Sequence, residues 1–586
     1  MSTRMHSSYY RRPKKVSSSL DGEYLPHPVS QVYPTVAPPS SSPCPPGSSI
    51  QIDCRLEGSS TKTCVRHETG KGSSDGGRCT YVFLCDTATV ADGCGVGRVT
   101  VDMLPDVALL EIFDCYVNQA REEVQYLPPA KIEAWHTLVH VCRTWRTIVL
   151  GSPSRLDLQL FCTNKTPAKE RLTIWPLLPI VIVQNGRPIQ MDNIIAALEH
   201  TDRVRQIHLL DIIIPELEVF LAATHQPFPA LTDLALWHPG QWVEDEMIEM
   251  PVIPELFLGG FAPRLQYLSL SRIPFSGLPK LLLSTTVLVE LSILEIPHSG
   301  YISPEAMVRC LSTLTRLEYL SLGFQSPLSR PVQESRRPHP STRLALPTLT
   351  DFQFEGVSEY LEDFVARIDA PLLEDLQIAF FHQLIFDTPQ LVQFFARTPN
   401  IQPRVNAHIV FFNRYVEISS SSSSSFTPKI MLRIGCSQSD WQLSSLAQLN
   451  SSSLPEAFIP TVERLYIYQY KYDEPRWQDD IEDSQWLEVL QPFTALKVLH
   501  VSQEFLPRLG PAFQELAGER VTEILPALQS LCLEELHPSG PVREAFEKFV
   551  AARQLAGHPI ALSDWSGPAD SDEEQDEWSE GDESDD

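Results

Sequence analysis

The chain has 586 residues, 43% of them hydrophobic, and a formal net charge of −28 at pH 7. This length allows about two to four domains, and the acidic balance argues against non-specific binding to nucleic acid, which needs a basic surface. The sequence has no apolar run of about 18 residues and no secretory signal. We therefore expect no membrane span and a cytoplasmic or nuclear location.

The N-terminal segment 1–98 is rich in Ser, Pro and Gly. Such a composition buries too little apolar surface to offset chain entropy, so a disordered leader is predicted. Six cysteines occur here without any C-x-x-C pair. Because zinc sites usually contain tighter pairs, we expect reduced thiols and no metal site.

Two apolar helices are predicted between Leu104 and Val149. The first follows Leu104-Pro105, where apolar residues recur at steps of three and four over about three turns. The second is expected to run as one amphipathic helix from Ile132 to Val149. These helices carry more apolar surface than they can bury against each other, which indicates a partner.

The residues Leu104-Pro105…Ile112-Phe113 and Val141-Cys142-Arg143-x-Trp145-Arg146 resemble an F-box, and the order of segments resembles F-box proteins of mushroom-type (basidiomycete) fungi. The resemblance implies an F-box at 99–153 that docks on the Skp-type adaptor of a cullin–RING ubiquitin ligase. The insert at 118–134 departs from the family because it is longer than the usual loop. An alternative is a helical hairpin inside a larger domain. The resemblance assigns adaptor docking or hairpin packing to Leu104, Pro105, Leu109, Leu110, Ile112, Phe113, Val141, Cys142 and Trp145.

Strands are expected at Leu156–Leu160 and Pro179–Val183, and beyond them a spacing L-x-x-L-x-L recurs. Copies are mostly 23 to 34 residues apart, which predicts an α/β solenoid over 154–560 with a parallel sheet and helices on its other side. The pattern resembles irregular leucine-rich repeats; the alternative is a non-repeat α/β domain. Copies begin at Val204, Leu231, Leu265, Leu288, Leu317, Leu349, Leu373, Val462, Leu496 and Leu528.

The gap between the seventh and eighth copies has room for about three further units. Strands are expected in it at Val405–Ile409 and Ile430–Ile434, with a flexible loop at Ser419–Ser425. Ser303 and Thr388 each precede a proline and are predicted helix caps. A last helix is expected at Val542–Leu555, followed by an acidic disordered tail at 561–586.

No catalytic motif is present: the sequence lacks a phosphate loop, an H-E-x-x-H pair and a G-x-S-x-G elbow. We therefore expect a protein that is not an enzyme and has no cofactor. His136 and His140 lie one helical turn apart, but no third metal ligand is near them in the sequence.

The third and fifth positions of each repeat point away from the leucines, so they are predicted to line a concave protein-binding face. Candidate target-binding residues on or beside it are Trp237, Tyr267, Tyr319, Arg464, Tyr466 and Tyr468. With the F-box resemblance, this predicts a substrate-receptor subunit of an SCF-type ligase. The alternative is a ligase-independent scaffold whose repeats and acidic tail bind basic partners.

Overall fold

The computed structural model describes residues 104–122, 134–163, 168–184, 188–240, 250–276, 278–331, 342–381, 386–401, 405–422, 425–436, 439–452, 459–470, 483–518, 520–535 and 540–565. The expectations for the leader, for most of the insert 118–134 and for the tail beyond Trp565 lie outside these residues.

Three helices come first among the described residues: α1 (Asp106–Glu122), α2 (Trp135–Val141) and α3 (Arg143–Gly151). The single helix expected from Ile132 to Val149 is therefore wrong. Cys142 interrupts it with extended backbone angles, φ −155° and ψ 172°, and its Sγ accepts a hydrogen bond from the backbone N–H of Trp145. We call α1–α3 the helical module.

The core of the helical module continues into the first strand of the sheet. Leu156, Leu158 and Leu160 belong to the same buried cluster as the helices, and the indole Nε1 of Trp135 donates to the backbone carbonyl of Gln159 at 3.2 Å. The strand expected at Leu156–Leu160 is wrong for its first four residues, because only Leu160–Cys162 pairs as β1. Leu156 and Leu158 instead pack in the helical core.

The described strands, apart from a two-stranded sheet of β8 (Leu344–Ala345) and β10 (Ile368–Asp369), join one 16-stranded sheet. All neighbours in it pair in parallel except those involving β13. The strands of this sheet are β1, β2 (Ile180–Gln184), β3 (Val204–Leu210), β4 (Asp233–Trp237), β5 (Tyr267–Ser271), β6 (Glu290–Ile296), β7 (Tyr319–Phe324), β9 (Asp351–Gly356), β11 (Asp375–Phe380), β12 (Asn406–Phe411), β13 (Tyr415–Ser422), β14 (Ser425–Gly435), β15 (Arg464–Gln469), β16 (Val498–Val501), β17 (Ser530–Glu534) and β18 (Ala561–Trp565).

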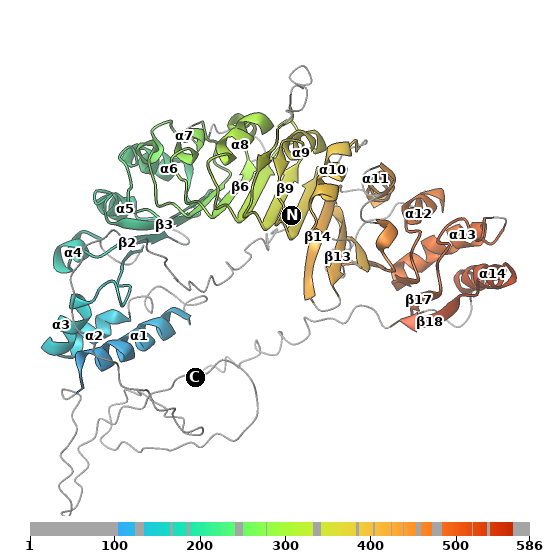
Figure 1. Ribbon diagram of the computed structural model, residues 1–586, viewed down its shortest axis with the longest axis horizontal. Coiled ribbons are helices and arrows are strands. Elements are labelled where there is room, and N and C mark those ends of the chain that lie inside the picture. Colours follow the sequence, from blue (N-terminus) through green and yellow to red (C-terminus); the bar gives the residue numbers. More distant parts are fainter. Residues whose placement is uncertain are drawn as a thin grey trace, which may run out of the picture. The chain divides into compact units, whose positions relative to one another are not determined.

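Helices connect most of the successive parallel strands and lie along one face of the sheet (Figure 1). We call the opposite side, where the repeat spacing placed the concave surface, the open face. The helices are α4 (Ala168–Ile174), α5 (Met191–Leu198), α6 (Ile214–Ala223), α7 (Leu278–Leu282), α8 (Pro304–Leu311), α9 (Ser358–Val365), α10 (Pro389–Arg397), α11 (Ser439–Ser452), α12 (Asp483–Leu490), α13 (Leu506–Leu516) and α14 (Pro541–Leu555).

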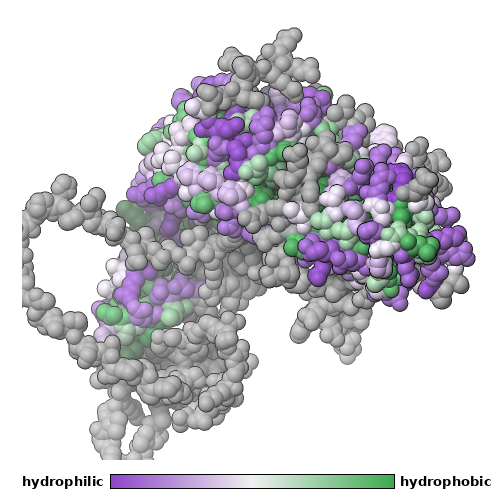
Figure 2. Space-filling view, turned by 45° about the vertical axis from the view of Figure 1, so that its right-hand side comes forward, coloured by the Kyte–Doolittle hydropathy of each residue, from purple (hydrophilic) through white to green (hydrophobic). Residues whose placement is uncertain are grey.

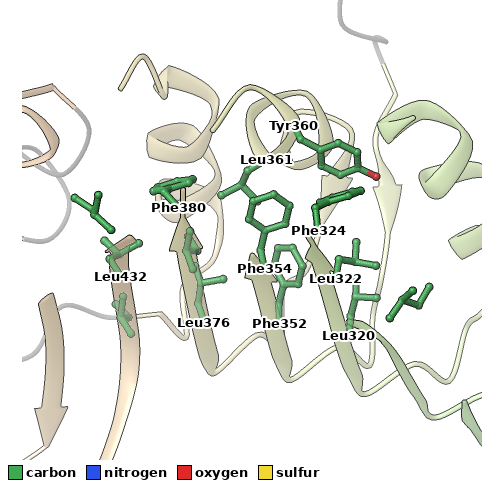
Figure 3. Packing of buried hydrophobic residues seen from close by; sticks show 14 of the residues in the cluster. Leu320, Leu322, Phe324, Phe352, Phe354, Tyr360, Leu361, Leu376, Phe380 and Leu432 are labelled. Atoms are coloured by element: carbon green, nitrogen blue, oxygen red, sulfur yellow. The ribbon is translucent and has the colours of Figure 1, made fainter. Parts of the chain in front are cut away.

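The repeat leucines form the core between sheet and helices. The three apolar template positions of all ten copies are buried, which confirms an α/β arrangement built on this spacing. Figure 3 shows this packing at β7, β9 and β11, where the Tyr360 ring of α9 lies 4.6 Å from that of Phe324. In these three strands, the apolar residues therefore pack against a helix and against apolar residues of neighbouring strands.

The gap between the seventh and eighth copies holds an antiparallel insertion instead of three strand–helix units. β14 pairs with β11 and β12 pairs with β15, while β13 runs antiparallel between β12 and β14. The flexible loop expected at Ser419–Ser425 is therefore wrong, since Ser419–Ser422 lies within β13. Strands on both sides supply its backbone partners, so pairing overrides the composition of the serine run.

Two further expectations differ from the structure. β18 extends the sheet by five residues into the segment assigned to the tail, so the expected tail can begin only at residue 566.

Ser303 caps α8 through its Oγ, but Thr388 makes no capping bond for α10. The Glu362 carboxylate replaces it and accepts from the backbone N–H groups of Gln390 and Leu391. None of the described helices is long and apolar enough to cross a bilayer.

Candidate functional site

The residues expected to dock the adaptor divide into core and surface. Leu109, Leu110 and Phe113 are buried in the helical module and cannot contact a partner directly. The half-buried members are Leu104, Ile112, Cys142 and Trp145, and the exposed members are Pro105 and Val141. Of Val141, 56% is exposed.

Two further apolar side chains of α1 are exposed. Val107, which follows Leu104-Pro105 in the predicted apolar stripe, is 63% exposed, and Tyr116 is 41% exposed. Hydrophobic and hydrophilic residues are interspersed over the described surface seen in Figure 2. The module thus offers separate apolar side chains on a polar background, and the helix spacing alone did not separate them from the core.

The histidine pair of α2 packs against an aromatic side chain. The His136 ring stacks on Trp175 with centroids 4.7 Å apart, and the His140 ring lies 6.3 Å from the same indole. The described residues contain no group of three His, Cys, Asp or Glu side chains that could hold a metal ion. Trp175 follows α4, so this contact fastens α2 to the start of the repeat region.

On the open face, Tyr267 and Tyr319 alternate with carboxylates from neighbouring strands. The paired register runs from Asp233 on β4 through Tyr267, Glu290 and Tyr319 to Asp351 on β9. We call these five residues the tyrosine–carboxylate row. Sequence reasoning named neither Asp233 nor Glu290, although both occupy the third template position and the same rule would have found them.

The tyrosine–carboxylate row has a negative electrostatic environment. Burial, followed by the charges of Asp233 and Asp351, raises the pKa of Glu290. Burial and the carboxylates of Asp233, Glu290 and Glu318 raise the pKa of Tyr267. A cation placed over this row would relieve the repulsion and face two aromatic rings, so the row favours lysine or arginine side chains.

A second group of rings lies on the open face of the C-terminal strands. His408, Tyr466 and His500 stack in order across β12, β15 and β16, with centroids 4.7 and 4.3 Å apart. The Trp565 ring of β18 lies 5.2 Å from His500, and Tyr468 meets His408 edge-on. We call these five residues the aromatic ladder.

Both histidines of the aromatic ladder have lowered pKa values, because burial disfavours the charged imidazolium of His408 and of His500. Burial, followed by the nearby charges of Arg464 and His408, lowers the pKa of His500 to about 4. Burial, then Glu417, raises the pKa of Tyr468 to about 12. Arg464 is exposed beside the ladder. His500 occupies the fifth template position and could have been identified from the sequence. Trp565 could not, because it lies in the segment that was assigned to the disordered tail.

The six target-binding candidates do not form one site. β7 and β15 are six strand positions apart in the sheet, which is about 29 Å at 4.8 Å per strand. Tyr267 and Tyr319 thus belong to one region and Tyr466, Tyr468 and Arg464 to another. Trp237 lies at the end of β4, in register with Ser271.

Replacing Glu355 by glutamine is expected to stabilise the fold at alkaline pH. Burial, then repulsion by Glu295, raises the pKa of this carboxyl from 4.5 to about 7, although Arg433 opposes the change. The folded state therefore holds the proton more tightly, so stability is lost as pH rises through the window from about 4.5 to about 7. Between pH 5 and pH 8 this group should cost the wild type on the order of 2–3 kcal/mol.

Urea unfolding of the wild type and Glu355→Gln at both pH values measures this difference. The variant should lose less stability between the two pH values than the wild type. An equal loss in both proteins would contradict the assignment of this pH dependence to Glu355.

No protein-family model and no curated protein sequence matches this chain. Among solved structures, the chain is similar to the leucine-rich repeat-containing protein LegL7 from Legionella pneumophila. The identity is 14%, and the match covers 67% of this chain and 97% of that protein, with a TM-score of 0.23. The repeat description of this chain therefore rests on its own leucine spacing and strand order.

Proposed function

We propose that this chain is a non-catalytic substrate receptor of an SCF-type cullin–RING ubiquitin ligase. In this proposal the helical module docks on the Skp-type adaptor, and the open face of the sheet binds a target protein. The exposed side chains of Val107 on α1 and Val141 on α2 support the docking role together with the F-box resemblance. The half-buried aromatic and charged residues of the open face support the binding role.

The single observation that carries the proposal is that residues leading into the first strands of the sheet pack within the core of the helical module. Leu156, Leu158 and Leu178, which lead into β1 and β2, pack in one cluster with α1–α3. A receptor works by proximity, because a tethered target presents its lysines at high effective concentration to the ubiquitin-carrying enzyme. Because the helical module packs against the start of the repeats, no flexible linker between them lowers the effective concentration of the target.

Co-purification with a Skp-type adaptor tests the docking role. The double variant Val107→Asp with Val141→Asp leaves the buried core intact but puts charges on the exposed side chains. We expect it to bind the adaptor about 30-fold more weakly or worse, as when interface anchors are lost. The matched control is Leu328→Asp with Leu372→Asp, which changes exposed leucines of the repeat region.

The control should retain adaptor binding. If the wild type brings down no adaptor, or if both double variants bind as well as the wild type, the docking role is rejected.

A ligase-independent scaffold is the second candidate, and the tyrosine–carboxylate row favours it equally because that row fits basic partners in either role. The two candidates differ in the fate of the bound protein. Proximity labelling with and without proteasome inhibition should reveal partners that accumulate only under inhibition if the chain is a receptor. Partners with unchanged abundance would support the scaffold.

A further inference from the structure

The last strand of the sheet leaves one edge without a described neighbour. β18 is the final strand of the sheet order and pairs only with β17 within the residues that the structure describes. Ala561, Ser563 and Asp564 are exposed. The first strand differs, since α1–α3 share a core with the residues around β1. An uncovered edge strand presents backbone donors and acceptors to another chain.

The hydrogen bonds of β18 identify which groups face outward. The backbone N–H of Ala561 donates to the carbonyl of Gln529, next to β17, at 2.9 Å. Because successive residues of a strand direct their backbone groups to opposite edges, Ser563 and Trp565 also face β17. The N–H and C=O groups of Leu562 and Asp564 therefore face the outer edge.

The edge strand carries one acidic side chain and precedes a strongly acidic sequence. Asp564 pairs in register with Leu533, a fully buried core position, yet the Asp564 side chain is exposed. Residues 566–586, which follow directly, contain 11 acidic residues and no Lys or Arg. Two copies of this chain would bring these charges together, so pairing between copies is disfavoured and a basic strand is favoured.

We propose that the outer edge of β18 accepts an extended, lysine- or arginine-rich segment of a partner protein as an additional strand. Backbone hydrogen bonds to Leu562 and Asp564 supply the binding energy, as in other cases of strand addition. The charge of Asp564, together with the 11 acidic residues that follow in the sequence, favours a basic segment. This site is separate from the open face and does not depend on the adaptor.

Binding of a labelled peptide of alternating lysine and valine to the full chain tests the proposal. We expect binding that weakens with salt, and slower hydrogen exchange at the amides of Leu562 and Asp564. The matched control is the same peptide N-methylated at alternate residues, which keeps every charge but loses the donors on one edge. It should bind about tenfold more weakly or worse, the effect of losing one to two net hydrogen bonds.

Two protein variants separate edge pairing from charge. Asp564→Pro removes an outward donor without removing a bond to β17, and it should weaken binding as much as N-methylation does. Asp564→Asn keeps the donor and should reduce binding less. Equal binding of the methylated and unmethylated peptides would mean attraction to the acidic tail alone and would overturn the proposal. Absence of binding at low salt would overturn it as well.

Discussion

Replacing Arg553 by methionine is expected to lower the free energy of unfolding by about 2–4 kcal/mol, the range for losing a buried hydrogen-bond network. Arg553 lies in α14 and is only 1% exposed. Its guanidinium donates to the backbone carbonyls of Val521, Leu525, Pro526 and Leu528 at 3.1–3.4 Å. Burial lowers its pKa, and no ion pair to this arginine occurs among the described residues.

The four carbonyls belong to the irregular segment that leads into β17. Methionine fills most of the space but donates nothing, so these buried acceptors lose their charged donor. Urea unfolding should detect the loss, and hydrogen exchange should place it at β17 and β18. Arg543→Met on the same helix is the matched control: this more exposed arginine pairs with Glu547, and such a pair contributes at most about 1 kcal/mol. Equal effects of both variants would contradict the network.

The strands of the repeats were predictable because burial dictates their pattern. A strand covered by helices on one face must place apolar residues at alternate positions, so Leu265, Leu268 and Leu270 identify β5 without any knowledge of its neighbours. β13 has no such signature. Its serines form a strand because β12 and β14 pair with them on either side. That pairing depends on the tertiary structure and leaves no pattern in the local sequence.

The candidate sites were predictable only in part, for a similar reason. Phe113 and Val141 are both apolar members of the same motif, yet one is buried and the other exposed. Which apolar residues face the core depends on how the three helices pack, and the break at Cys142 that separates α2 from α3 gives no periodic signal. His500 and Tyr466 sit in different repeats, and only the strand register brings their rings together.

Replacing Trp135 by alanine is expected to unfold the helical module while the repeats stay folded. Trp135 is 1% exposed, and its ring packs edge-on against Trp175 with centroids 5.0 Å apart. Truncating such a side chain costs about 3–5 kcal/mol, which is a large part of the stability that a core of this size supplies. The module core is distinct from the repeat core, with half-buried Leu172 packed against both. Little of the cost should therefore reach the distant strands.

Hydrogen exchange distinguishes this local loss from global unfolding. Amides of α1–α3 and β1 should exchange fast in Trp135→Ala, whereas those of β16 and β17 should stay protected. Trp441→Ala is the control, since that indole is 49% exposed on α11 and its loss should leave the module protected. Because Val107 and Val141 depend on the module's fold for their placement, Trp135→Ala should also abolish adaptor binding. Fast exchange throughout the sheet would mean that the two cores fold as one unit.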